Sequence, residues 1–158
     1  MKLAPQATPV VKMVELIMPQ DANNFGTLFG GKLLEFIDKC AAITAFRYTG
    51  TQVVTASFER IDFLEAIHIA DIIELTGRII FTGKTSLVII VDVYRQKGNG
   101  PLTKATSGYT VFVAVDAKGN PIPVPPLAVN TPEEKKLWER GRELKEHIKQ
   151  RAEKDKSI

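Results

Sequence analysis

The sequence predicts an α+β domain in which a curved antiparallel β-sheet packs against one long helix. Three observations lead to this prediction. A single long stretch has helical periodicity, the region after it has the composition of β-strands, and turn signals join those strands in antiparallel order. Because no other apolar helix is available to cover the sheet, we expect the long helix to be well buried.

The first third of the chain supplies a strand, a loop and the helix. Residues 10–17 are β-branched and partly alternating, which predicts a strand, and residues 19–26 are rich in Pro, Asp, Asn and Gly, which favour a loop. Residues 29–46 contain no proline and predict the helix. Its apolar side chains recur at helical spacing, and we expect the buried side to consist of Phe29, Leu33, Phe36, Ile37, Cys40, Ile43 and Thr44.

The middle of the chain predicts the rest of the sheet. Four segments are rich in β-branched and aromatic residues and read as strands, over residues 53–63, 72–81, 87–94 and 103–115. Turn signals at residues 97–101 and 117–120 indicate hairpins. Four prolines in residues 121–126 then end the sheet.

The C-terminal segment begins with a helix-start signature. Thr131, Pro132 and Glu134 have the spacing of a capping box with proline at the first helical position. Apolar residues are sparse in this helix, so we expect it to be peripheral, to fray after residue 150 and to have no catalytic role. The chain therefore divides into a domain over residues 8–126 and a charged helical tail over residues 127–158.

Composition excludes several classes of function. The 158 residues hold 21 Lys or Arg against 18 Asp or Glu, and charges of both signs are mixed along the tail, so we expect no nucleic-acid partner. No apolar run is long enough to span a bilayer, which argues against membrane insertion. Cys40 is the single cysteine and must be a free thiol, which suits a reducing compartment, and we expect a cytoplasmic protein.

Asp38 is the most informative position of the predicted helix. On a helical wheel it lies apart from the solvent face of Lys32, Glu35 and Lys39, and no Lys or Arg three or four residues away is placed to pair with it. Such a carboxylate is either a general base or a half-exposed residue at the edge of the solvent face. Its neighbours on the wheel are small or apolar residues: Gly31, Leu34, Ala41, Ala42 and Ala45.

The helix start is a second candidate. The unpaired N–H groups near Gly30 and Gly31 could hold a developing oxyanion, or the glycines could simply permit tight packing of helix on sheet. His68 and His147 are too few and too far apart for a metal cluster or a Ser/His/Asp triad. We therefore expect no metal, and we interpret Cys40 as a packing residue.

Four segments together resemble the acyl-CoA hydrolase family of hotdog-fold thioesterases, over roughly residues 10–125. They read Pro19-x-Asp-Ala-Asn23-x-x-Gly26-x-x-Phe-Gly-Gly31-x-Leu-Leu-x-x-x-Asp38, Val53-Val-Thr-Ala-Ser57, Thr82-Gly-Lys-Thr-Ser86 and Val115-Asp-x-x-Gly-x-Pro-x-Pro123. The resemblance implies a curved sheet wrapped around a central helix. It also implies dimers with active sites at their interface, and assembly of three dimers into a hexamer.

The resemblance also assigns roles to residues. Asn23 and Asp38 match the catalytic pair, which acts from opposite subunits, and Gly30 and Gly31 match the glycines whose amides polarise the thioester carbonyl. The residues that match substrate or CoA contacts are Thr55, Gly83, Lys84, Thr85 and Ser86.

The function implied is hydrolysis of a medium- to long-chain fatty acyl-CoA to a free acid and CoA. Asp38 would either activate water or attack the carbonyl itself, and the sequence does not separate these routes. No cofactor is expected, because CoA is part of the substrate and a thioester is already activated. A non-catalytic acyl-CoA sensor on the same fold is the alternative. A hotdog dehydratase is disfavoured, since neither histidine is suitably placed.

Overall fold

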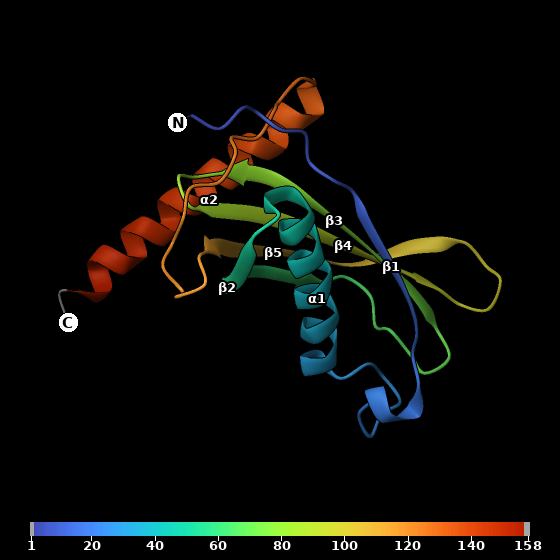
Figure 1. Cartoon of the computed structure of the whole chain (residues 1–158). Coiled ribbons are helices and arrows are strands. Elements are labelled where there is room, and N and C mark those ends of the chain that lie inside the picture. Colours follow the sequence, from blue (N-terminus) through green and yellow to red (C-terminus); the bar gives the residue numbers. More distant parts are fainter. Residues whose placement is uncertain (1, 157–158) are drawn as a thin grey trace.

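The chain folds around a five-stranded sheet with strand order β1-β3-β4-β5-β2, in which every pair of neighbours is antiparallel (Figure 1). This computed structural model describes residues 2–156. The strands are β1 (Val11–Leu16), β2 (Gln52–Phe63), β3 (Ile72–Thr82), β4 (Ser86–Gln96) and β5 (Leu102–Val115). The predicted α+β class and all five predicted strands are confirmed, and β1 and β2 form the two edges of the sheet.

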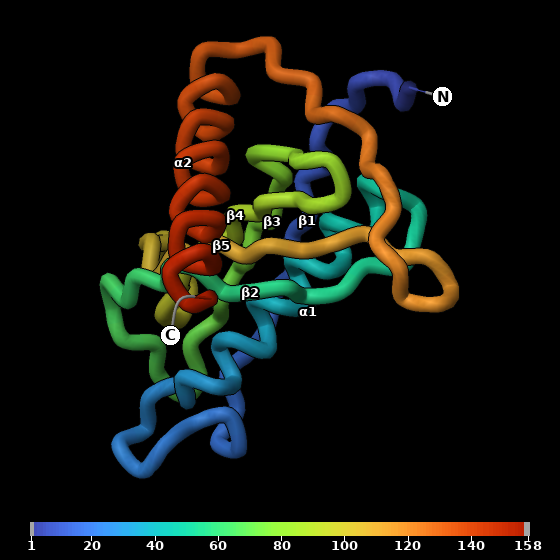
Figure 2. Tube along the Cα trace, turned by 90° about the vertical axis from the view of Figure 1, so that its left-hand side faces the viewer, coloured from blue at the N-terminus to red at the C-terminus, as the bar shows by residue number. Residues whose placement is uncertain are grey.

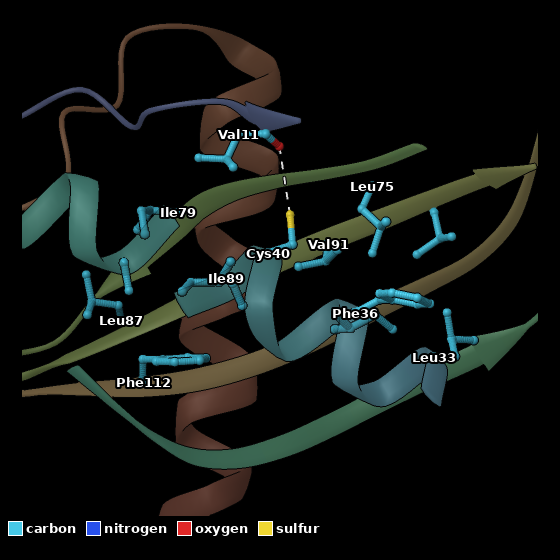
Figure 3. Packing of buried hydrophobic residues seen from close by; sticks show 14 of the residues in the cluster. Val11, Leu33, Phe36, Cys40, Leu75, Ile79, Leu87, Ile89, Val91 and Phe112 are labelled. Atoms are coloured by element: carbon cyan, nitrogen blue, oxygen red, sulfur yellow. Dashed lines mark hydrogen bonds between the residues drawn. The ribbon is translucent and has the colours of Figure 1, made fainter. Parts of the chain in front are cut away.

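Helix α1 (Gly30–Thr49) lies across one face of the sheet, which curves around it (Figures 1 and 2). Its buried side chains, among them Leu33, Phe36 and Cys40, pack against strand residues such as Leu75 and Phe112 (Figure 3). Most of the core lies in this layer, and the expectation of a well-buried helix is confirmed.

A glycine on β3 allows the helix to approach this closely. A Cβ at Gly77 would lie 2.5 Å from Thr44 Oγ1 and 3.1 Å from Cys40 Sγ, so even an alanine there would push α1 away from the sheet. The helix ends at Thr49, three residues later than predicted, and its C-cap Gly50 adopts the left-handed conformation with φ of 67° that favours glycine.

Two residues expected in the core are exposed. Phe29 is 59% exposed because it precedes the helix as its N-cap, and Ile43 is 38% exposed because it faces outward beside the edge strand β2. Conversely, Ala41 and Ala45, placed by the helical wheel on the face of small residues around Asp38, are fully buried. The accessible face of small residues around Asp38 is therefore narrower than the helical wheel predicts.

Helix α2 (Pro132–Asp155) lies on the opposite face of the sheet from α1 (Figure 2). The capping box is present, since Thr131 Oγ1 accepts a hydrogen bond from the Glu134 amide at 3.1 Å and Glu134 Oε1 accepts one from the Thr131 amide at 3.0 Å. The helix covers a second, smaller cluster of buried residues: Ile80, Val88, Ile90 and Val111. The predicted fraying after residue 150 is wrong, because the helix continues to Asp155 and Arg151 is bound to the sheet.

None of the helices within residues 2–156 is long and apolar enough to cross a membrane.

The buried thiol predicts a loss of stability at alkaline pH. Burial raises the pKa of the Cys40 thiol from 9.0 to about 11, so the folded state holds this proton more tightly than the unfolded state. The stabilising contribution is complete below pH 9 and is lost as pH rises through the folded pKa. We expect the free energy of unfolding to fall by about 2 kcal/mol between pH 8 and pH 10.5 from this group alone.

Guanidinium denaturation at both pH values measures this effect. Burial also raises the pKa of Tyr48 to about 12, and this contribution is common to the wild type and to Cys40→Ala. The variant should lose about 1 kcal/mol at pH 8 through lost packing and show a smaller further fall at pH 10.5. An equal fall in both proteins would show that the thiol does not cause the pH dependence.

Candidate active site

A short hydrogen bond joins α1 to β2 at the predicted acid. Thr55 Oγ1 donates to Asp38 Oδ1 at 2.7 Å, and Asp38 is half-buried, with no ion-pair partner among residues 2–156. The position of Thr55 depends on a β-bulge, because the pairing of β2 with β5 shifts between Thr55 and Ser57 and leaves Ala56 without a partner. Thr55, expected among the substrate contacts, therefore touches the candidate base itself.

The other acid on the same helix has a different environment. Glu35 forms ion pairs with Lys32 and Lys39, each at 3.2 Å, on the solvent face. Hydrogen bonds from these two lysines hold the pKa of Glu35 below its usual value. Two lysines thus balance the charge of Glu35. The partner of Asp38 is instead a neutral hydroxyl, which does not balance the charge of a carboxylate.

The start of α1 presents free backbone donors. The N-cap residue Phe29 makes no side-chain capping bond, and within residues 2–156 the amides of Gly30 and Gly31 have no hydrogen-bond acceptor. A Cβ at Gly30 would meet nothing within 4 Å, and one at Gly31 would meet only the Phe29 ring. The glycines are therefore not needed for packing of helix on sheet, and the space outside them is open to a ligand.

Asn23 organises the loop that precedes this helix start. Its side-chain oxygen accepts bonds from the Phe25 and Thr27 amides at 2.9 and 3.2 Å, and its Nδ2 donates to Thr27 Oγ1 at 2.8 Å. One hydrogen on Nδ2 is left over for another acceptor. No hydrogen bond joins Asn23 to Asp38 in the described part of the chain, so a single chain does not bring the predicted catalytic pair into contact.

The predicted CoA-contacting segment lies elsewhere. The turn between β3 and β4 carries Gly83, Lys84 and Thr85, and Ser86 begins β4; this turn lies at the opposite end of α1 from the Asn23 loop (Figures 1 and 2). A backbone hydrogen bond anchors the turn, since the Lys84 carbonyl accepts from the Val124 amide at 2.9 Å. The Lys84 side chain is exposed. Within residues 2–156, no hydrogen bond or ion pair joins this segment to Asp38 or Asn23.

An apolar groove that sequence reasoning missed runs beside the edge strand. It has a volume of about 690 Å³, and α1 and β2 supply most of its lining. Phe46, on its α1 side, is 57% exposed. Ala42 lies one helical turn after Asp38, and Val54 directly precedes Thr55, so the groove starts beside the candidate acid. The paired valines at positions 53 and 54 could have signalled it, because a strand buried on one face alternates apolar with polar residues.

Neither histidine stands with the candidate acid. His68 lies in the loop before β3, beside Asp71, and His147 is on α2, across the sheet from α1. Within residues 2–156, no three His, Cys, Asp or Glu side chains are grouped so that they could hold a metal ion.

Comparison with known proteins identifies the class to which this fold and these residues belong. A family model of the thioesterase superfamily matches residues 25–101, which contain the helix start, Asp38 and Thr55. The uncharacterized acyl-CoA thioester hydrolase YkhA of Bacillus subtilis is 38% identical over 119 residues, which are 75% of this chain and 69% of that protein.

Solved structures agree with this class. An apo hexameric acyl-CoA thioesterase has a TM-score of 0.88 at 38% identity, covering 96% of this chain and 98% of the other. The acyl-CoA hydrolase of Staphylococcus aureus, in complex with butyryl coenzyme A, coenzyme A and coenzyme A disulfide, has a TM-score of 0.86 at 33% identity, covering 94% and 91%. The chain belongs to the acyl-CoA thioester hydrolase family, and its architecture is the hotdog fold of these hydrolases.

Proposed function

We propose that this protein hydrolyses fatty acyl-CoA to a free acid and CoA, in an active site formed between two copies of the chain. The observation that carries the proposal is the Thr55–Asp38 hydrogen bond, which fixes a carboxylate without an ion-pair partner in residues 2–156 at the mouth of an apolar groove. We also propose a cytoplasmic location, which the free thiol of Cys40 supports because such thiols suit a reducing compartment.

A comparison of spacing supports these residues. Three variants of the Staphylococcus aureus enzyme carry alanine in place of an asparagine, an aspartate 15 residues later and a threonine 17 residues after that. Asn23, Asp38 and Thr55 have the same two separations in this chain.

Helix geometry supports a site made of two chains. Asp38 follows Gly30 by eight residues, which places it about 12 Å further along the helix axis. A base and an oxyanion donor must each lie about 3 Å from the same reacting group. One chain cannot place both there, so we assign Asn23, Gly30 and Gly31 of one chain and Asp38 with Thr55 of a second chain to each site.

In this mechanism Asp38 takes a proton from a water molecule as the water oxygen attacks the thioester carbon. The amides at Gly30 and Gly31, helped by the positive end of the helix dipole, stabilise the oxyanion, and the free hydrogen of Asn23 Nδ2 orients the carbonyl or the water. The intermediate then collapses, the carbon–sulfur bond breaks, and the sulfur takes the proton back from Asp38, so that CoA leaves as its thiol. In the alternative route Asp38 attacks the carbonyl carbon, the carbon–sulfur bond breaks and CoA leaves as a thiolate, and water then hydrolyses the anhydride to the free acid and the Asp38 carboxylate.

The CoA moiety is assigned to the β3–β4 turn of a neighbouring chain. Lys84 is exposed there, and an ammonium can hold a phosphate as a point charge. We propose that the chain forms a dimer and that dimers assemble into hexamers, as in the hexameric thioesterase, so that this turn of one chain can reach CoA bound at a neighbouring site.

Thiol release from a series of acyl-CoA substrates tests the proposed function. Turnover of fatty acyl-CoA by the wild-type protein, with sizing to confirm assembly, is the expected result. Binding of acyl-CoA without release of CoA would instead identify a non-catalytic sensor.

We also propose a preferred acyl-chain length from the length of the groove. An acyl chain that starts at Asp38 and runs along α1 reaches Phe46 after about 12 Å, the length of roughly ten carbons in extended form. Phe46 and Arg47 lie at the far end of this path. We therefore expect medium-chain substrates to fill the groove, since each buried methylene adds about 0.8 kcal/mol until the space ends.

Truncating Phe46 at the far end of the groove should shift the substrate preference toward longer acyl chains. In Phe46→Ala, the ratio of kcat/KM for hexadecanoyl-CoA to that for decanoyl-CoA should rise roughly tenfold, because the longer chain gains room. Leu102→Ala is a matched control, since Leu102 is an exposed apolar residue at the start of β5 outside the groove. An unchanged ratio in an assembled Phe46→Ala protein would place the acyl chain elsewhere.

A further inference from the structure

The edge strand β2 carries a second bulge whose side chain is almost completely buried. The pairing of β2 with β5 shifts again between Phe58 and Arg60, which leaves Glu59 without a partner. The side chain of Glu59 is only 5% exposed. A carboxylate in such a place needs a compensating charge, because removing it from water is costly.

The compensating charge comes from the last turns of α2. Arg151 Nη2 donates to Glu59 Oε1 at 3.0 Å and to Oε2 at 3.1 Å, across 92 residues of sequence. Within residues 2–156, Arg151 is the only ion-pair partner of Glu59, since the adjacent Arg60 pairs with Asp62. The end of the tail is thus tied to the strand that carries Thr55.

Further contacts hold α2 in the register that this pair requires. Gly141 packs directly on Phe81, leaving no room for a Cβ, and the Trp138 ring lies 5.2 Å from the Phe81 ring. Arg140 Nη1 donates to the Tyr109 hydroxyl at 3.1 Å, and Tyr109 is the residue paired with Arg60 beside the bulge.

A link from this pair to the site follows from the position of β2. Among residues 2–156 of one chain, this edge strand pairs with β5 alone, so the course of β2 depends on its two bulges. One bulge follows Thr55, which holds Asp38, and the other contains Glu59. Freeing Glu59 would let it turn toward water and change the course of the strand between the bulges.

We propose that Arg151 is a positioning residue for the acyl-CoA hydrolase site. It acts through Glu59 to hold β2, and β2 in turn holds Thr55 against Asp38. This inference rests on the proposed function, and it gives α2 a positioning role beyond the expectation that this helix has no catalytic role. The tail does not touch the reacting atoms; it fixes the strand that orients the base.

The test compares Arg151→Ala with Arg142→Ala and Arg151→Lys in assembled protein. Arg142 is a matched control because, among the residues that the structure describes, its ion pair is with Glu139 on its own helix. Arg151→Ala should lower kcat roughly three- to tenfold with KM changed less than about twofold, Arg151→Lys should recover most of the loss, and Arg142→Ala should behave as wild type. Equal kcat values for Arg151→Ala and the wild type would overturn the proposal.

A double-mutant cycle separates positioning from general loss of stability. If Arg151 acts through Thr55, then Arg151→Ala should have little further effect on kcat in a Thr55→Val background. Independent, additive losses would contradict the proposed route. Gly141→Leu, which displaces α2 from Phe81, should reproduce the kcat loss of Arg151→Ala.

Amide hydrogen exchange keeps the inference distinct from the proposed function. Exchange in residues 52–58 should rise in Arg151→Ala and not in Arg142→Ala, whatever the substrate proves to be. Unchanged exchange would overturn the link between tail and strand even if the wild type is active. A wild type that hydrolyses no acyl-CoA would overturn the proposed function alone.

Discussion

Replacing Asp38 with asparagine is expected to lower kcat by about 10³-fold while leaving the assembly intact, which is within the range for loss of a general base. Asparagine has the shape of aspartate and can still accept the hydrogen bond that Thr55 Oγ1 donates at 2.7 Å. It cannot take a proton from water, nor can it attack a thioester as a carboxylate does. Steady-state thiol release at saturating acyl-CoA measures the loss, and KM should change little.

Glu35→Gln provides the control for removing a carboxylate from the same helix. Glu35 is one turn earlier and is paired with Lys32 and Lys39, so we expect its kcat to stay within about twofold of wild type. Comparable losses in both variants would mean that the charge of the helix, and not the position of Asp38, matters. Full activity in assembled Asp38→Asn would remove Asp38 from the mechanism.

A single turnover in ¹⁸O-labelled water distinguishes the two routes for Asp38. If Asp38 acts as a general base, the label enters only the product acid. If Asp38 forms an anhydride, water attack at the side-chain carbonyl leaves label in Asp38 itself, which mass spectrometry of the peptide detects.

The sequence predicted the sheet and the central helix well because their signals are local. Strand composition, the hairpin turn at residues 97–101 and the capping box at Thr131 each depend on a few neighbouring residues, and the structure has each of them. Residues 117–120 form a turn closed by the isolated bridge between Val115 and Pro121, with no strand after it. The errors lie where burial depends on other elements. Phe29 and Ile43 fit the helical period of a core face, yet they are exposed because one precedes the helix and the other faces the groove by the edge strand.

The sequence predicted which residues form the candidate site, but not how these residues contact one another within the chain. Helical spacing singled out Asp38, but its bond to Thr55 depends on a bulge at Ala56, and a bulge leaves no periodic signal in the sequence. The pairing of Glu59 with Arg151 was equally out of reach, because 92 residues separate them. The few apolar residues of α2 predicted that the end of this helix frays, whereas the ion pair between Arg151 and the nearly buried Glu59 holds the end in place.

Mixing two inactive variants should restore activity, because the site is assigned to two chains. Asn23→Ala is expected to lose at least roughly 10²-fold in kcat, since it removes the free Nδ2 hydrogen that orients the substrate. Alone, neither Asn23→Ala nor Asp38→Asn has an intact site. In a mixed dimer, one site combines both altered residues, and the other combines Asn23 of one chain with Asp38 of its partner and is intact.

The expected recovery follows from counting. When equal amounts of the two variants are unfolded and refolded together, about half of the dimers are mixed, and each has one intact site of two, so activity should return to about a quarter of wild type. Variants refolded separately and then combined without exchange serve as the control and should stay inactive. If co-refolded protein assembles but gains nothing, Asn23 and Asp38 must serve the same site from one chain. That result would contradict the separation of about 12 Å between Asp38 and the helix start on which the two-chain site rests.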